Sequence, residues 1–274
     1  MNWVPLLFID DVCHQLNKRR FSQVSQLSGS WSEFGSEHHK KRRELKFRCK
    51  VYDQKVIYSF RKTDWPCREV TVADLNLEFD RITDLACGSA HPMPHRVSLH
   101  EFERVVLPTI APLVMNCCWQ YSERSLQNRF FFNAFKNCPG FNDINVKEQG
   151  QESRDFVARQ VQLRNVQTLY LSGTGKWPKA ENLGETLKIF VSSARFHQLN
   201  SPDHLTDHYE LFQLFLERAL AKELKPGAYI SARGTNFDKT RLLALHQDCG
   251  HNSTKEAWRI PDSNLRIALR YCTG

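Results

Sequence analysis

Two stretches near the start of the chain repeat apolar residues with the period of an α-helix. Within residues 4–16 and again within 21–35, apolar positions recur three or four residues apart, which is the spacing of one helical face. The apolar positions are Val4, Leu7, Phe8, Val12, Leu16, Val24, Leu27, Trp31 and Phe34. The pattern predicts two helices, each with one face suited to burial.

The period then changes to that of a β-strand. Residues 44–60 alternate apolar and polar positions on both sides of Asp53–Gln54, which predicts a hairpin with one buried face. A further strand is expected at Glu69–Phe79. Beyond it, Ser98 and Glu101 form a capping box that begins a helix, and Met115–Tyr121 follows as a strand.

The second half of the chain alternates helices and strands. A helix is expected at Leu126–Phe135, and the polar residues 141–151 are expected to form a loop. Helices at Ser153–Leu163, Leu183–Ser193 and His208–Leu224 each precede a strand, at Gln167–Gly173, Phe196–Ser201 and Ala228–Gly234. A last helix at Lys239–Leu245 precedes strands near Ala257–Ile260 and Leu265–Tyr271.

The expected fold class is therefore α+β or α/β, with helix–strand units of roughly thirty residues. Such units are typical of stacked repeats, here irregular and like leucine-rich repeats, since the leucine-rich consensus is absent. The even spacing favours a curved solenoid. A compact, doubly wound α/β domain is the alternative that the pattern leaves open.

Within these strands the alternation separates a buried face from an outward one. Leu169 and Leu171 share one face of their strand, and Ala228, Ile230 and Ala232 share one face of theirs. If the sheet has an open face, the outward side chains could contact a partner. The outward candidates are Tyr170, Ser172, Tyr229, Ser231 and Arg233.

Composition is that of a folded protein outside the secretory route. The chain has 274 residues, of which 41% are hydrophobic and 25% charged, and its nine cysteines are irregularly spaced. An odd, irregular set favours reduced thiols over a disulfide framework. Asp10 and Asp11 interrupt the first apolar run, so it is a poor secretory signal, and 105–122 contains two prolines that argue against a membrane span. An intracellular protein, cytoplasmic or nuclear, is expected.

The net charge of +8 raises the possibility of nucleic-acid binding. Its densest segment is "HHKKRR", His38–Arg43, which follows a predicted helix. Cations there are favoured by the negative end of the helix dipole. A solvated helix end is the preferred interpretation, and a nucleic-acid patch that includes Lys40–Arg43 is the alternative.

Motifs for catalysis or cofactor binding are weak. "SGTGKW" at 172–177 follows a strand, but it lacks the first glycine and the final Ser or Thr of a phosphate loop. His246, Cys249 and His251 lack a second ligand pair at the spacing of a zinc site, and His91 and His95 flank a proline-rich link. We therefore expect no catalytic residues, no metal and no cofactor, although these residues do not exclude an enzyme.

Read together, the first two helices resemble an F-box. The resemblance rests on an early proline, apolar anchors and a helix near a tryptophan. The wider chain is similar to the F-box-like proteins, expanded in nematodes, that carry an F-box-associated C-terminal region. That likeness rests on "VPLLFIDDV", "SQLSGSW", "SLHEFERVVLP", "LQNRFF" and "LYLSGTGKWP" with the helix after it. The chain departs from the family in lacking a second Leu–Pro element between its helices.

The resemblance implies a non-catalytic adaptor with an F-box-like segment at 1–43 and a partner-binding region at 44–274, most regular at 98–250. In that family the first segment binds a Skp1-type subunit of a cullin ubiquitin ligase, and the second binds a protein substrate. The implied anchors are Val4, Pro5, Phe8, Ile9, Val12, Leu16, Leu27 and Trp31. Alternatively, the first helix packs on the protein's own sheet.

Overall fold

The computed structural model describes residues 4–16, 18–63, 69–88, 93–121, 129–172, 177, 181–201, 209–233, 250–252, 257–259 and 266–270. They form a mixed α/β protein whose strands pair mostly in parallel. The chain divides into two compact units, Met1–Cys118 and Trp119–Gly274. The boundary expected after residue 43 lies inside the first unit.

Three helices begin the first unit: α1 (Leu6–Gln15), α2 (Phe21–Val24) and α3 (Ser30–Lys41), with a 3₁₀ turn at Lys18–Arg20 before α2. The helix predicted at 21–35 is two helices. α2 ends at Val24, and Gly29, at φ +64°, occupies the N-cap position before α3. A Cβ on Gly35 would lie 2.8 Å from Val24 Cγ1, so glycine there lets α2 and α3 pack closely.

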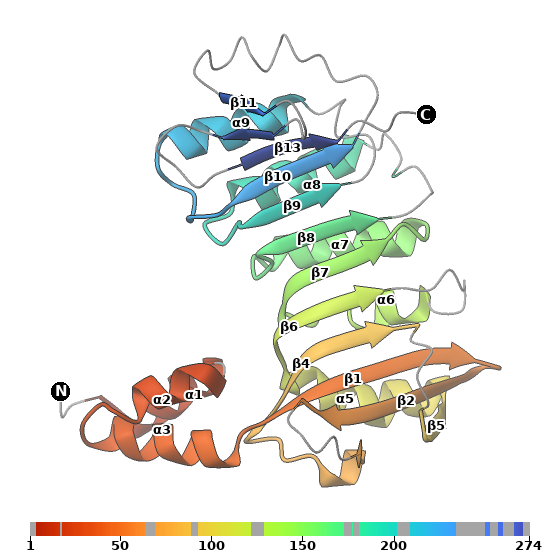
Figure 1. Cartoon of the computed structure of the whole chain (residues 1–274). Helices are drawn as coiled ribbons and strands as arrows, with labels where there is room; N and C mark the ends of the chain where they lie inside the picture. Colours follow the sequence, from red (N-terminus) through yellow and green to blue (C-terminus); the bar gives the residue numbers. More distant parts are fainter. Residues whose placement is uncertain are drawn as a thin grey trace. The chain divides into compact units, whose positions relative to one another are not determined.

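The strands of the first unit are β1 (Arg43–Tyr52), β2 (Lys55–Lys62), β3 (Glu69–Val70), β4 (Asp80–Cys87) and β5 (His95–Ser98). The predicted hairpin is confirmed: β1 and β2 pair antiparallel, with Asp53 and Gln54 at φ +49° and +57° in the turn. β1 also pairs in parallel with β4 (Figure 1).

Two expectations for this unit are corrected. The strand expected at Glu69–Phe79 is only the two residues of β3, followed by a 3₁₀ turn at Val72–Asp74. β4 was not predicted, because its first residues, Asp80 and Arg81, are charged and yet buried. Their burial depends on partners elsewhere in the chain, which no local pattern reveals.

The predicted capping at Ser98 is confirmed, since its Oγ accepts the backbone N–H of Glu101 at 3.1 Å. The helical segment that follows is continuous but irregular. It comprises α4 (Leu99–Glu101), a π-helical turn (Phe102–Val106), α5 (Leu107–Ile110) and a 3₁₀ turn (Ala111–Leu113). Strand β6 (Val114–Tyr121), also expected, contains the boundary between the two units.

In the second unit, helices alternate with strands. The elements are α6 (Phe130–Ala134), β7 (Phe141–Lys147), α7 (Gln151–Gln162), β8 (Thr168–Ser172), α8 (Glu181–Ser192), β9 (Gln198–Ser201), α9 (Tyr209–Leu220) and β10 (Tyr229–Arg233). The loop expected at 141–151 is wrong, because it contains β7 and the start of α7. Asn142, Asp143 and Asn145 made β7 look polar, whereas Phe141, Ile144 and Val146 are fully buried.

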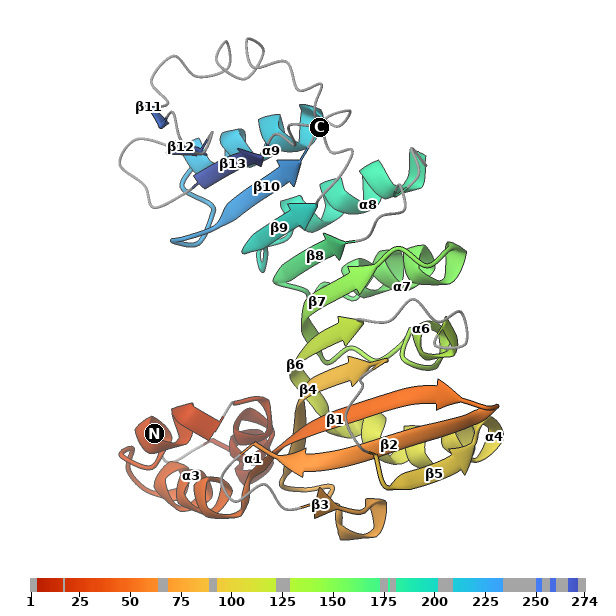
Figure 2. The same ribbon diagram turned by 45° about the vertical axis from the view of Figure 1, so that its right-hand side comes forward.

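Strands β7, β8, β9 and β10 lie next to one another in chain order and are all parallel. Helices α6 to α9 pack on one another in the same order and lie on one face of these strands (Figures 1 and 2). Beyond β10 lie β13 (Arg266–Arg270), which is parallel to it, then β12 (Ala257–Arg259) and β11 (Gly250–Asn252), which are antiparallel.

An aromatic cluster forms a large part of the core of the second unit. The Trp119 ring lies 4.8 Å from the ring of Phe156, 5.1 Å from that of Phe141 and 5.3 Å from that of Phe135, measured between centroids. All four side chains are fully buried. They come from β6, α7, β7 and the residue after α6. The cluster therefore packs the first elements of this unit against one another.

Among the described helices, none is long and apolar enough to cross a membrane. The six described cysteines are Cys13, Cys49, Cys87, Cys117, Cys118 and Cys138, and all of them are free thiols. This agrees with the expectation of reduced cysteines for the part of the chain that the structure covers.

Candidate functional site

The start of α1 exposes a run of large apolar side chains. Leu7 is 80% exposed, Leu6 is 56% and Phe8 is 54%, and Leu27, in the turn before α3, is 52%. The Phe8 ring meets the ring of Trp31 edge-on at 6.4 Å. We call Leu6, Leu7, Phe8 and Leu27 the apolar surface.

The opposite side of α1 faces the other helices. Ile9 and Cys13 are buried with Phe21 and Val24 in a small core. Ile9 is only 2% exposed, which corrects its assignment as an outward anchor. A helix that packs against two others must bury one side, and Ile9 lies on that side.

The other expected anchors divide between the core edge and the surface. Pro5, Phe8 and Leu27 are exposed, whereas Val12 is half-buried. The remaining three anchors pack against the core and are also half-buried: Val4, Leu16 and Trp31. Leu6 and Leu7 were both missing from the expected anchors, although the run "PLLF" carries more apolar residues than a single helical stripe needs.

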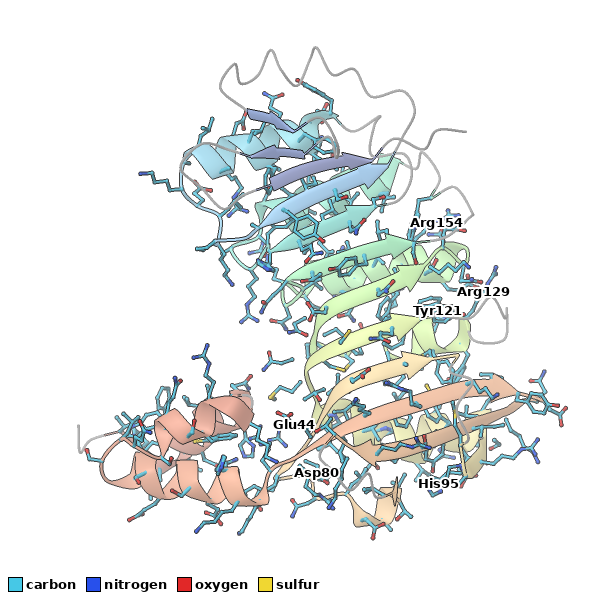
Figure 3. All side chains as sticks on the ribbon, in the orientation of Figure 1. Glu44, Asp80, His95, Tyr121, Arg129 and Arg154 are labelled. Atoms are coloured by element: carbon cyan, nitrogen blue, oxygen red, sulfur yellow. The ribbon has the colours of Figure 1, made fainter. Side chains whose placement is uncertain are left out.

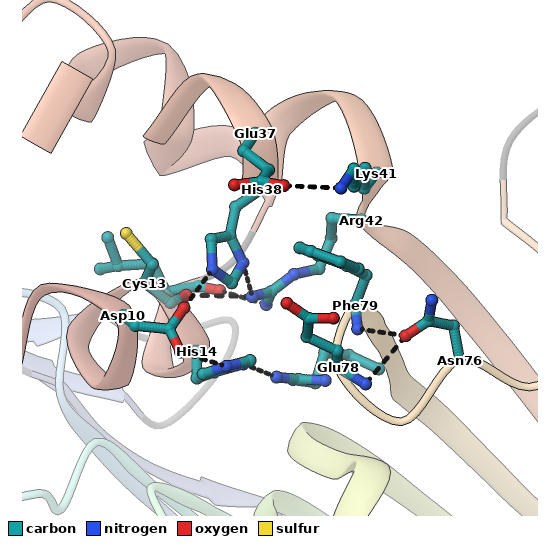
Figure 4. Close-up of polar contacts among 12 residues, drawn as sticks. Asp10, Cys13, His14, Glu37, His38, Lys41, Arg42, Asn76, Glu78 and Phe79 are labelled. Carbon is teal, nitrogen blue, oxygen red and sulfur yellow. Dashed lines mark hydrogen bonds and ion pairs between the residues drawn. The ribbon is translucent and has the colours of Figure 1, made fainter. Parts of the chain in front are cut away.

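Beneath α1 lies a chain of five polar side chains, which we call the Arg–His–Asp network (Figure 4). Asp10 accepts from both histidines, from His38 Nε2 at 2.9 Å and from His14 Nε2 at 3.2 Å. The other ring nitrogens, the two Nδ1 atoms, each face an arginine. Arg42 donates to His38 at 3.0 Å, and Arg81 donates to His14. The network joins α1, α3 and β4.

These contacts define the protonation state of both rings. Nδ1 accepts from a guanidinium, so the ring proton resides on Nε2 and points at Asp10. Burial and the charge of Arg81 lower the pKa of His14 more than Asp10 raises it. Burial also lowers the pKa of His38 and outweighs its hydrogen bond to Asp10. Both imidazoles are therefore held neutral.

The pKa values of Asp10 and Arg42 are also shifted by this environment. Burial raises the pKa of Asp10, but the hydrogen bonds that it accepts from His38 and His14 outweigh this effect, so the pKa is lowered. Burial lowers the pKa of Arg42 to about 10. Arg42 also donates to the carbonyls of Cys13 and Leu16, both at 3.0 Å, and so holds the C-terminal end of α1.

Asp10, His14 and His38 place one ligand atom each within 4.8 Å of one another, as in a three-ligand metal site. A metal at Nε2 would require the ring proton on Nδ1. Both Nδ1 atoms face guanidinium N–H groups, and the two positive charges would repel a dication. The arrangement suits attachment of helices better than metal binding. The sequence signal was the Asp10–His14 spacing of one helical turn.

The basic segment His38–Arg43 has few cations available for phosphate. His38 and Arg42 are buried in the network, and Arg43 makes a bidentate pair with the buried Asp80, at 2.6 and 2.5 Å. Lys41 pairs with Glu37 at 2.6 Å, which leaves His39 and Lys40. The nucleic-acid alternative therefore gains no support from this segment. Figure 3 shows Asp80 and Glu44 close to where the helices meet the strands.

In the second unit, the strand face opposite the helices is polar. Neighbouring positions on successive strands are Asn145, Tyr170, Asn200 and Ser231, and one step away lie Asp143, Thr168, Gln198 and Tyr229. Gln198 was not predicted. Its amide donates to the hydroxyls of Tyr170 and Tyr229 and joins two of the expected outward residues.

The other expected residues of this face vary in exposure. Ser172 is half-buried and donates to the Val146 carbonyl at 3.4 Å, while Ser231 is only 5% exposed. Arg233 ends β10, and its side chain lies outside the described residues. Tyr170 and Tyr229, both half-buried, are therefore the largest side chains that this face offers.

The motifs weighed in the sequence fall largely outside the described residues. His91, His246, Cys249 and the glycines of "SGTGKW" are not described. His251 lies in β11 without a described side chain, and His95 lies in β5, where its ring packs against Tyr58 at 5.2 Å. None of these residues adds to the sites above.

Comparison with known proteins finds no family model and no curated protein sequence that matches this chain. The fold and the sites described above are therefore the basis for any statement about function.

Proposed function

We propose that the protein is a non-catalytic, F-box-like adaptor whose N-terminal helices bind a Skp1-type subunit of a cullin ubiquitin ligase. The observation that carries the proposal is the run of Leu6, Leu7 and Phe8 on the outer side of a helix whose inner side is buried. Adjacent exposed apolar side chains of this size are typical of a protein-interaction surface. The choice of a Skp1-type partner rests on the likeness of "VPLLFIDDV" to the start of an F-box.

The C-terminal region would then bind the substrate. Parallel strands in chain order with helices on one face favour an irregular repeat architecture like that of leucine-rich repeats over a doubly wound domain. The polar face with Tyr170, Gln198 and Tyr229 is the proposed substrate surface. Bridging would raise the local concentration of substrate beside the ligase.

Capture of a purified Skp1-type protein tests the proposal. Phe8→Asp places a charge in the centre of the apolar surface, and we expect binding to weaken by about 2 kcal/mol or more, as for an interface hot spot. Gln15→Asp adds the same charge to the exposed last turn of α1 and is the matched control. Circular dichroism confirms that both variants fold.

Two results would refute the adaptor role. One is that the native chain fails to capture the purified Skp1-type protein. The other is that Phe8→Asp and Gln15→Asp bind it equally well, because the apolar surface would then have no part in the contact.

A further inference from the structure

An open hollow of about 540 Å³ lies in the second unit, where the turn from α7 to β8 adjoins the turn from α8 to β9. Arg164 comes from the first turn, and Ser193 and Arg195 come from the second. The last turns of α8 contribute Lys188, Ile189 and Ser192. The pairing of Thr168 with Gln198 places the two turns side by side.

Two of the three cations in this hollow are available to a ligand. Arg164 and Arg195 are exposed, and neither forms an ion pair with any residue that the structure describes. Lys188 is already neutralised, because its Nζ lies 3.0 Å from Glu185 and 2.5 Å from Glu210. The two guanidinium groups therefore supply the unpaired positive charge.

The end of α8 does not cancel that charge. Its last carbonyls would normally present the negative end of the helix dipole to the hollow. Here the carbonyls of Val191 and Ser193 accept from the guanidinium of Arg218, the latter at 3.0 Å. Ser193 Oγ in turn accepts the Arg195 backbone N–H at 3.2 Å and fixes the turn that carries this arginine.

The hollow also has an apolar patch. Ile189 is 47% exposed and lines the hollow together with the two arginines. The carboxylates of Glu185 and Glu210 lie beside Lys188, so the anionic groups of a ligand are favoured only at the two arginines. A short peptide can place its acidic groups on the arginines and an apolar side chain on Ile189.

We propose that this hollow binds a short acidic peptide segment that contains one apolar residue. Carboxylates of the peptide pair with Arg164 and Arg195, whose planar guanidinium groups suit bidentate contacts. The apolar side chain covers Ile189. This site is separate from the apolar surface of the first unit and does not depend on adaptor binding.

Fluorescence anisotropy with a labelled peptide of Asp and Glu around one central Leu tests the site. The double variant Arg164→Glu/Arg195→Glu should bind about tenfold more weakly or worse, since two charge-assisted contacts are lost. Lys46→Glu/Lys55→Glu changes the net charge equally at exposed positions of the first unit and should bind as the native chain does. Binding should also weaken as salt rises.

The apolar contact is tested by a double-mutant cycle. Ile189→Ser should weaken binding of the Leu peptide but leave binding of its Ser analogue unchanged. Phe8→Asp should leave peptide binding unchanged, so failure here and failure of the adaptor proposal are distinguishable.

Any of three results would overturn the site. The first is the absence of saturable peptide binding at about 1 mM. The second is equally tight binding of a neutral peptide with Asn and Gln in place of the acids. The third is displacement of the peptide by a thymidine oligonucleotide, which would identify nucleic acid as the ligand.

Discussion

The N-terminal helices and the helix–strand units of the second unit distribute their side chains in opposite ways. In α1 to α3, large apolar residues such as Leu7 are exposed, while the polar side chains of His38 and Arg42 are buried and contact each other. In β7 to β10, apolar side chains pack beneath the helices and a polar face remains on the other side. The two regions therefore present surfaces of different chemistry.

The difference follows from the size of the core in each region. Among the described residues, the three short helices bury a core of four apolar side chains, Ile9, Cys13, Phe21 and Val24, with half-buried apolar residues at its edge. The Arg–His–Asp network adds polar contacts between α1, α3 and β4. The second unit buries Trp119 among phenylalanine rings and does not rely on such a network there. Polar attachment leaves the apolar residues of α1 free for a partner.

The largest effect should come from removing the aromatic core of the second unit. Trp119→Ala deletes a fully buried side chain and should lower the free energy of unfolding by about 3–5 kcal/mol, measured by urea denaturation. Trp119→Phe should cost less, because the indole N–H has no partner among the described residues. Ile189→Ala, at an exposed position, should change stability by less than about 0.5 kcal/mol. If Trp119→Ala lowers the free energy of unfolding by less than about 0.5 kcal/mol, the assignment of Trp119 to the core is wrong.

Arg42→Met tests the polar attachment of α1. The change leaves the Cys13 and Leu16 carbonyls and His38 Nδ1 without their donor, and we expect a loss of about 2–3 kcal/mol. Hydrogen exchange should accelerate in α1 and not in α7. Lys40→Met, at an exposed position of the same helix end, should leave exchange unchanged. Equal exchange in both variants would show that the network does not hold the helix.

Acid should loosen α1 before it affects the second unit. The folded-state pKa values of His14 and His38 are lowered, so the unfolded state binds more protons below about pH 6.5. The stability that neutral histidines permit is fully present above that pH and falls as pH decreases toward the folded pKa values. The lowered pKa of Asp10 adds a second loss below about pH 3.8. Hydrogen exchange of α1, measured as a function of pH, should show the loss of stability caused by protonation of the histidines. The double variant His14→Gln/His38→Gln should reduce this pH dependence.

The smallest effect is expected on the polar face. Tyr170→Phe removes one acceptor of the Gln198 amide and should cost about 0.5–1.5 kcal/mol. The ring remains, so the strand should keep its pairing. A matched Tyr52→Phe change, at an exposed position of the first unit, should cost nothing measurable. If both changes are neutral, the Tyr170–Gln198–Tyr229 contacts do not order this face.

Local pattern predicted many of the described elements but not all. The hairpin around Asp53–Gln54 and the helix–strand alternation after residue 150 follow from period and turn residues alone. β4 and β7 were missed because Asp80 and Asn142 give them a polar appearance. The buried Asp80 is stabilised by Arg43, which pairs with it from a strand 37 residues earlier, and by the backbone N–H of Asn76.

The sequence by itself determined many of the helices and strands, because apolar periodicity is a local property of the chain, but it did not determine β4 and β7, where polar residues interrupt the pattern. Only the tertiary structure decided that Ile9 is buried and Phe8 exposed, although both belong to the same apolar run. The same holds for the Arg–His–Asp network, since Arg81 meets His14 across 67 residues. Contacts between distant segments determine burial, protonation and the surfaces left for partners, and no local spacing encodes them.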